Sequence, residues 1–255
     1  MLFDSHAHYN DERFLKDVNE VLNSLKENNV GYVMNACSSI EEIPYILELA
    51  EKYDFLYASV GVHPHEVHNM KETDLNILKN YANHKKVKAI GEIGLDYYYD
   101  NSPRDVQKEW FYKQIELAKE IGLPIIIHDR DAHRDCMEIL KKADASKCGG
   151  VFHCYSASAE MLDDVIDMGF YVAFGGSITF KNANKPVEAV KKAPIDRILI
   201  ETDCPYLTPE PYRGKRNSSL YIGNVVKKIA QIKQMDEDEI ESITYENAKK
   251  CFRID

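Results

Sequence analysis

Six side chains of the types that bind divalent metals follow short apolar segments of the chain. They are four histidines and two carboxylates, namely His6, His8, Glu92, His128, His153 and Asp203. Any one of them alone would more often be a hydrogen-bonded residue of the core. Together they would be costly to bury beside Ile and Val unless a cation paired with them. Their joint occurrence therefore predicts a metal site.

This ligand set predicts two divalent ions and hydrolytic chemistry. His6 and His8 are two residues apart, so an extended strand puts both imidazoles on one face. Glu92 is expected to bridge the ions, because its strand lies between those that carry the histidines. Two ions about 3.5–4 Å apart can clamp the oxygens of an in-line phosphoryl displacement. Asp203 is then expected to orient the attacking water or accept its proton. Mixed nitrogen and oxygen ligands suit Zn, Mn, Fe or Ni, and Mg less well, without distinguishing among them.

Two further segments are candidates for binding the substrate. In VGVHPHEVH, His63 is closest to the preceding apolar segment and is expected to hydrogen-bond a phosphate, whereas His65 and His68 are expected at the surface. PYRGKRNSS is a dense basic segment in an acidic chain, and a guanidinium group can grip phosphate with two hydrogen bonds. Its candidate phosphate ligands are Arg213, Lys215 and Arg216. The alternative is that this segment is simply a solvated loop.

The tyrosines of the segment YYY, residues 97–99, could form a stacking platform for bases, although packing in the core or at its rim is an equally good interpretation. Other nucleotide and nucleophile motifs are missing. The chain has no GxGxxG segment, no phosphate-binding P-loop and no GxSxG elbow. Dinucleotide-dependent and serine-hydrolase chemistry are therefore not indicated.

The candidate ligands must be positioned by strands that alternate with helices. Short apolar segments rich in β-branched residues recur, separated by amphipathic stretches with helical spacing. The expected strands are Leu2–Asp4, Tyr32–Ala36, Leu56–Val62, Val87–Ile93, Pro124–His128, Gly150–Cys154, Phe170–Phe174 and Arg197–Glu201. Eight such units in about 250 residues predict an α/β fold, a (β/α)8 TIM-type barrel, with a doubly wound open sheet as the alternative. The segment Ser218–Asp255 is expected to add two C-terminal helices, and residues 1–255 to form one domain.

Composition narrows the class of protein. The chain has 255 residues, is 44% hydrophobic and carries a net charge of −10. This charge argues against nonspecific coating of nucleic acid, which needs a basic surface, but permits a local grip on phosphates. The N-terminal segment lacks the pattern of a secretory signal and no apolar run is long enough to span a membrane, so a cytoplasmic location is expected. The six cysteines show no regular spacing and are expected to be reduced packing residues.

The chain resembles the TatD family of metal-dependent deoxyribonucleases, which belongs to the amidohydrolase-like barrels. The resemblance runs almost from end to end through DSHAHY, VGVHPH, IGEIGLDYYYD, LPIIIHDRDA, GVFHCYS, RILIETDCPYL and YRGKRN. It implies a TIM-type barrel, divalent metals on the six residues named above, and hydrolysis of phosphodiesters in DNA, often as an exonuclease. Two positions depart from the pattern: Ser218–Ser219 stands where Glu-Pro is common, and Cys204 where Ala or Ser is common. The first departure puts substrate contacts in question.

Two other functions remain open. One is a metal-dependent esterase or amidohydrolase on the same barrel, acting on a small molecule or on aminoacyl-tRNA. The other is a metal-binding or partner-binding barrel without catalytic activity, which the complete ligand set disfavours. The expected partner is DNA or another phosphodiester and not a membrane, and a monomer is compatible with the sequence.

Overall fold

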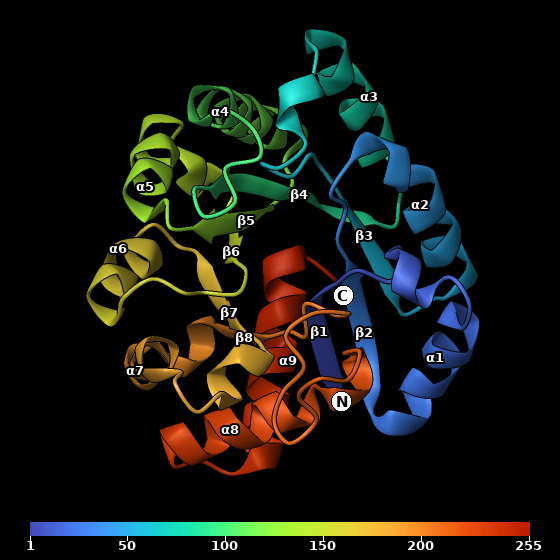
Figure 1. Cartoon of the computed structure of the whole chain (residues 1–255), viewed down its shortest axis with the longest axis vertical. Coiled ribbons are helices and arrows are strands. Elements are labelled where there is room, and N and C mark those ends of the chain that lie inside the picture. Colours follow the sequence, from blue (N-terminus) through green and yellow to red (C-terminus); the bar gives the residue numbers. More distant parts are fainter.

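A computed structural model describes all residues, Met1–Asp255, as a ring of eight parallel strands surrounded by helices (Figure 1). The strands are β1 (Leu2–Ala7), β2 (Val30–Asn35), β3 (Leu56–Val60), β4 (Val87–Asp96), β5 (Ile125–Arg130), β6 (Gly150–Phe152), β7 (Tyr171–Phe174) and β8 (Ile198–Ile200). Each strand pairs with the next. The two ends of the sheet meet through two backbone hydrogen bonds: the Asp203 N–H donates to the His6 carbonyl at 2.9 Å, and the His8 N–H donates to the Cys204 carbonyl at 2.7 Å. This closure confirms the (β/α)8 barrel and excludes the open doubly wound sheet.

The helices follow the predicted alternation. A helix joins each strand to the next, and two more follow β8: they are α1 (Val18–Leu25), α2 (Ile43–Lys52), α3 (Glu72–Ala82), α4 (Arg104–Ile121), α5 (His133–Lys142), α6 (Leu162–Asp167), α7 (Asn184–Lys192), α8 (Gly223–Lys233) and α9 (Glu237–Phe252). The two C-terminal helices confirm the prediction for the tail. Acidic residues occupy the first turn of α9 and lysines its last turn, an arrangement that favours the helix dipole. None of the helices combines the length and the apolar character that a membrane span requires.

Several strand bounds differ from the predicted ones: β3 and β6 end two residues earlier, at Val60 and Phe152, whereas β4 runs three residues longer. The prediction ended the fourth strand at Ile93, but β4 continues to Asp96, so the strand carries Asp96 as well as Glu92. The pairing of β4 with β5 changes register between Ile90 and Ile93. At Gly94, with φ of 149°, an added Cβ would lie 1.9 Å from the His128 carbonyl oxygen, so only glycine allows this close approach. Gly91 and Gly94 interrupt the apolar pattern of this segment, so the sequence pattern predicts an end of the strand that is too early.

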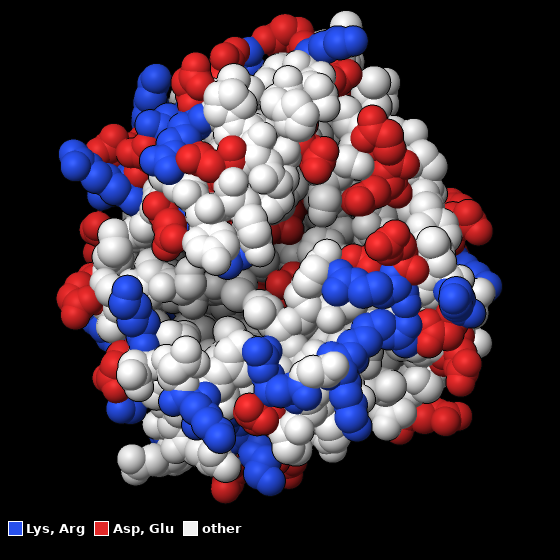
Figure 2. Space-filling model, viewed as in Figure 1, with Lys and Arg blue, Asp and Glu red and all other residues white.

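The carboxyl ends of the strands open onto one face of the barrel. Figure 2, which looks onto the long segment between β8 and α8, shows a hollow near the centre of this face with acidic side chains on its floor. Lys and Arg side chains gather along the lower rim of the hollow (Figure 2). The mouth therefore combines buried carboxylates with basic groups at its edge.

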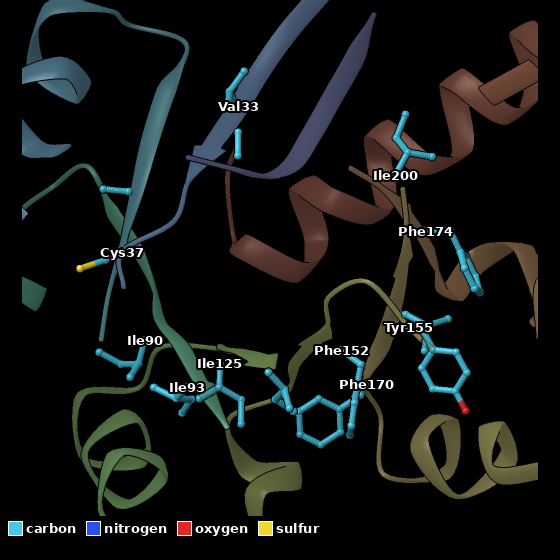
Figure 3. Close-up of a cluster of buried hydrophobic side chains, with 14 of the residues drawn as sticks. Val33, Cys37, Ile90, Ile93, Ile125, Phe152, Tyr155, Phe170, Phe174 and Ile200 are labelled. Carbon is cyan, nitrogen blue, oxygen red and sulfur yellow. The ribbon is translucent and has the colours of Figure 1, made fainter. Parts of the chain in front are cut away.

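The core has two parts. The larger lies between the strands and the surrounding helices and includes Ile90, Ile93 and Ile125 (Figure 3). The smaller fills the interior of the barrel at the amino ends of the strands, where Phe3 packs against Phe252 of α9. Because α9 closes that end, the opposite end is left for polar side chains, as is usual for barrels of this type.

Candidate metal centre

Glu92 lies at the centre of a buried cluster of histidines, and its side chain is only 3% exposed. Its Oε2 atom is 3.3 Å from Nε2 of His6 and 3.8 Å from Nε2 of His8. Its Oε1 atom is 2.6 Å from Nδ1 of His128 and 2.8 Å from Nε2 of His153. The two oxygens of one carboxylate thus face two separate histidine pairs.

Asp203 completes the cluster from the segment that follows β8. Its Oδ1 atom is 3.4 Å from Nε2 of His8 and 3.8 Å from Nε2 of His6. The backbone bond from its N–H to the His6 carbonyl holds it beside β1. The structure therefore brings together all six residues that the sequence singled out, although they are spread over most of the chain.

The donor set fits divalent cations. Nε2 of His6 and Nε2 of His8 face each other at 3.0 Å, and Nδ1 of His128 faces Nε2 of His153 at 3.2 Å. Only one nitrogen of each facing pair can present a proton to the other, so lone pairs converge beside ionised carboxylates. Three-residue groups with suitable ligand atoms are His6–His8–Asp203, His63–Glu92–His128 and His6–His153–Glu201. Imidazole and carboxylate donors in this number suit first-row divalent metals.

Electrostatics keeps the central carboxylate ionised. Burial by itself would raise the pKa of Glu92, but the nearby histidines His153, His63 and His6 outweigh it and hold the pKa well below its ordinary value. Burial lowers the pKa of His63 to about 4, so this imidazole is neutral at pH 7. For His153, burial acts in the same direction, but Glu92 and Glu201 outweigh it and raise the pKa well above 6.5. A divalent cation at this ring would compete with a proton, so metal affinity should rise with pH.

Two buried carboxylates beside the candidate ligand histidines were missed by the sequence analysis, and only Asp96 is within hydrogen-bond distance of its histidine. Oδ2 of Asp96 is 3.0 Å from Nε2 of His128, and Oε1 of Glu201 is 3.7 Å from Nδ1 of His153. Carboxylates of this kind commonly fix the tautomer and orientation of metal-binding histidines. Glu201 ends the apolar segment RILIE, so the rule that found Glu92 could have found it. Asp96 was missed because the strand was predicted to end before it.

The three histidines that follow β3 have different environments. Nε2 of His63 lies 3.5 Å from Oε1 of Glu92, so His63 belongs to the buried cluster. Nε2 of His65 contacts Oδ2 of Asp96 at 2.9 Å, and its side chain is 24% exposed. The prediction that His65 is a surface residue is therefore only partly correct, because its ring is partly exposed but is held at the mouth by the Asp96 carboxylate. His68 is exposed, as expected.

The three basic residues of the segment after β8 differ in their contacts. The guanidinium of Arg216 forms two hydrogen bonds with the Asp17 carboxylate, at 2.8 and 2.6 Å, and is engaged there. Arg213 has no hydrogen bond or ion pair through its side chain and lies over the Phe180 ring, 3.8 Å from its centroid. Lys215 is also exposed without an ion pair. Arg213 and Lys215 are thus free to meet an anion, whereas Asp17 competes for Arg216.

The two departures from the family pattern are buried. The Ser219 hydroxyl donates to Oδ2 of Asp4 at 2.6 Å and accepts from the Tyr9 hydroxyl at 2.8 Å. Asp4 also accepts from the Thr202 backbone and hydroxyl, which ties β1 to the segment that carries Asp203. The expectation that Ser218–Ser219 alters substrate contacts is not supported by this geometry, because both serines face inward. The Cys204 thiol is likewise buried, and burial raises its pKa.

Comparisons with known proteins agree with this geometry. Residues 3–253 match the family model described as TatD related DNase. The chain is 51% identical to the metal-dependent hydrolase YabD of Bacillus subtilis, with all of both chains covered, and 35% identical to the metal-dependent hydrolase YcfH of Escherichia coli, with 100% of this chain and 96% of the relative covered. Among solved structures, YJJV, a TatD homologue from Escherichia coli, superposes with a TM-score of 0.93 at 28% identity, covering 100% of this chain and 98% of the other. The chain therefore belongs to the TatD-related DNase family of metal-dependent hydrolases.

Proposed function

We propose that the protein is a phosphodiesterase that uses two divalent metal ions to hydrolyse DNA. The observation that carries the proposal is the shared carboxylate, because Glu92 presents one oxygen to His6 and His8 and the other to His128 and His153. One ion would be held on the side of His6, His8 and Asp203, and the other on the side of His128 and His153. Zn, Mn, Fe, Ni and Mg all remain candidates.

When bound, the ions would supply Lewis acidity and lower the pKa of an attacking water. Asp203 is suited to accept the proton of that water. Its side chain is 16% exposed, against 3% for Glu92, so it is the more accessible of the two carboxylates in the cluster. The pKa of Asp203 is lowered: burial opposes this, but the hydrogen bond with His8 and the charges of the histidines outweigh it. The carboxylate is thus available as a base near neutral pH.

The preference for a phosphodiester is supported by the rim of the site and by the family. Arg213 and Lys215 are exposed without carboxylate partners, in a chain whose net charge is −10. Two such cations on the segment that also carries Asp203 suit a substrate whose reacting group is anionic. Neutral His63, next to Glu92, could also hydrogen-bond a phosphate oxygen. The family model is named for DNase activity, which agrees with this assignment.

The test is hydrolysis by metal-reconstituted protein of end-labelled single-stranded DNA, duplex DNA, RNA and aminoacyl-tRNA. We expect cleavage of DNA, loss of activity with EDTA and recovery with added metal. Asp203→Asn should abolish cleavage, while circular dichroism shows an unchanged fold. A ladder of products from one end would identify an exonuclease. Release of amino acid from tRNA without cleavage of any phosphodiester would overturn the proposal in favour of ester hydrolysis.

A further inference from the structure

The turn after β4 exposes two aromatic rings at the mouth of the barrel. Tyr98 and Tyr99 are 59% and 55% exposed, and their ring centroids are 4.9 Å apart at an interplanar angle of 89°. The preceding Tyr97 is only partly exposed, and its hydroxyl donates to Asp135 at 2.6 Å. Packing in the core therefore accounts for Tyr97 and not for the two rings that follow it.

A cation without a carboxylate partner lies against both exposed rings. The Arg130 guanidinium carbon is 4.1 Å from the Tyr98 ring centroid and 4.8 Å from that of Tyr99. Its side chain makes no hydrogen bond or ion pair within the protein. Arg104 provides the contrast, because it lies in the same way over Tyr97 but is neutralised by Asp100 at 2.8 Å. Arg130 thus brings a positive charge without a carboxylate partner next to the two exposed rings.

One carboxylate fixes these rings relative to the candidate metal centre. Oδ1 of Asp96 accepts from the backbone N–H groups of Tyr98 and Tyr99, at 3.0 and 2.8 Å. Oδ2 of the same residue contacts Nε2 of His128 at 3.0 Å. The His65 ring also lies edge-on to Tyr99, with centroids 5.3 Å apart. The rings are therefore attached to the cluster by a short, buried connection.

We propose that Tyr98, Tyr99 and Arg130 form a subsite for an unpaired nucleobase and its phosphate, next to the phosphodiester that is cleaved. The inference rests on the proposed function and narrows its substrate to single-stranded nucleic acid. Every base has a face that can stack on an exposed tyrosine, whereas the bases of a duplex are already stacked and paired. The guanidinium of Arg130 can add a charge-assisted hydrogen bond to the adjoining phosphate.

The test compares two single-stranded oligonucleotides with identical phosphorothioate backbones, which slow hydrolysis. One carries bases throughout, and the other carries abasic sugars. Dissociation constants are measured by fluorescence anisotropy with the full-length, metal-loaded protein. Tyr98→Ala should weaken binding of the base-bearing strand roughly tenfold and leave the abasic strand unchanged, because stacking on a ring contributes about that much. Tyr98→Phe keeps the ring and should bind like the parent.

Arg130→Ala should weaken binding of both strands and reduce the slope of log K against log salt by about 0.7, as expected for one lost phosphate contact on a single strand. Arg104→Ala is the matched control and should change neither quantity. Equal affinities for Tyr98→Ala and the parent, or an equal loss on the abasic strand, would overturn the subsite.

Hydrolysis is measured separately, so the two proposals can fail independently. Base-dependent binding without cleavage of DNA would support the subsite and overturn the phosphodiesterase assignment. Cleavage of DNA with no effect of Tyr98→Ala on binding would support the phosphodiesterase assignment and overturn the subsite.

Discussion

Asp96→Asn changes one atom of a buried carboxylate and should weaken metal binding without contacting the metal. Oδ2 of Asp96 accepts from Nε2 of His128, which leaves Nδ1 of that ring directed at Oε1 of Glu92. An amide nitrogen in place of Oδ2 would direct its N–H at the N–H on Nε2 of His128, and two donors cannot form a hydrogen bond. The His128 ring must then change tautomer or turn, and either change removes a ligand nitrogen from its place. The remaining amide oxygen can still accept from the backbone of Tyr98 and Tyr99, so the turn should persist.

The size of the effect follows from this contact. Loss of a carboxylate that orients a metal-binding histidine typically costs 10–100-fold in affinity, which corresponds to roughly 1.4–2.7 kcal/mol. Burial opposes ionisation of Asp96, but its bonds with His128 and His65 outweigh it and hold its pKa far below the ordinary value, so the parent is fully ionised in a neutral buffer. Competition with a chromogenic chelator, titrated with Zn or Mn at pH 7.5 in both proteins, measures the ratio of dissociation constants.

His65→Phe is the control for this experiment. It removes the other ring held by Oδ2 of Asp96 but leaves His128 bonded, so metal affinity should stay within about threefold of the parent, below the range expected for a lost orienting carboxylate. A dissociation constant for Asp96→Asn within about twofold of the parent would refute the reasoning. So would a loss in His65→Phe as large as the loss in Asp96→Asn.

Three further outcomes are expected. Adding Zn or Mn to EDTA-treated protein at about 100 times the dissociation constant should stabilise it by about 2.7 kcal/mol and raise Tm by roughly 5–10 °C in scanning fluorimetry; an unchanged Tm would contradict binding to the folded state. Ser219→Ala should lower the free energy of unfolding in urea by about 1–3 kcal/mol, because the buried Tyr9 hydroxyl loses its acceptor. Ser218→Ala, whose hydroxyl makes no hydrogen bond within the protein, should lower it by about 0.5 kcal/mol or less. Equal urea midpoints for the two variants would contradict a stabilising role of the hydrogen bonds of Ser219. Arg213→Ala should raise KM for DNA and flatten its dependence on salt by the equivalent of about one phosphate contact, while Arg216→Ala, already paired with Asp17, should leave that dependence unchanged.

The sequence by itself determined the alternation of eight strands with helices and the six residues of the cluster, but not that the sheet closes into a barrel. Strands buried on both faces need continuous apolar runs, and eight of them separated by helices suit a parallel barrel, so the local pattern indicates this fold. Closure depends on the contacts between β1 and the segment after β8. The spacing of His6 and His8 is likewise local, because side chains alternate along a strand. The resemblance to a known family, carried by motifs such as DSHAHY and GVFHCYS, then added the expected chemistry.

The tertiary structure decided how those residues face one another and which neighbours they have. That the two oxygens of Glu92 meet different histidine pairs depends on the register of β4 against β5, which changes beside it. That Arg216 is engaged by Asp17 depends on a contact between residues 199 positions apart. Asp96 contacts His128 only because β4 continues beyond Glu92 and places the Asp96 carboxylate beside that ring. Contacts between distant segments depend on how the barrel closes and packs, so no local pattern of the sequence predicts them.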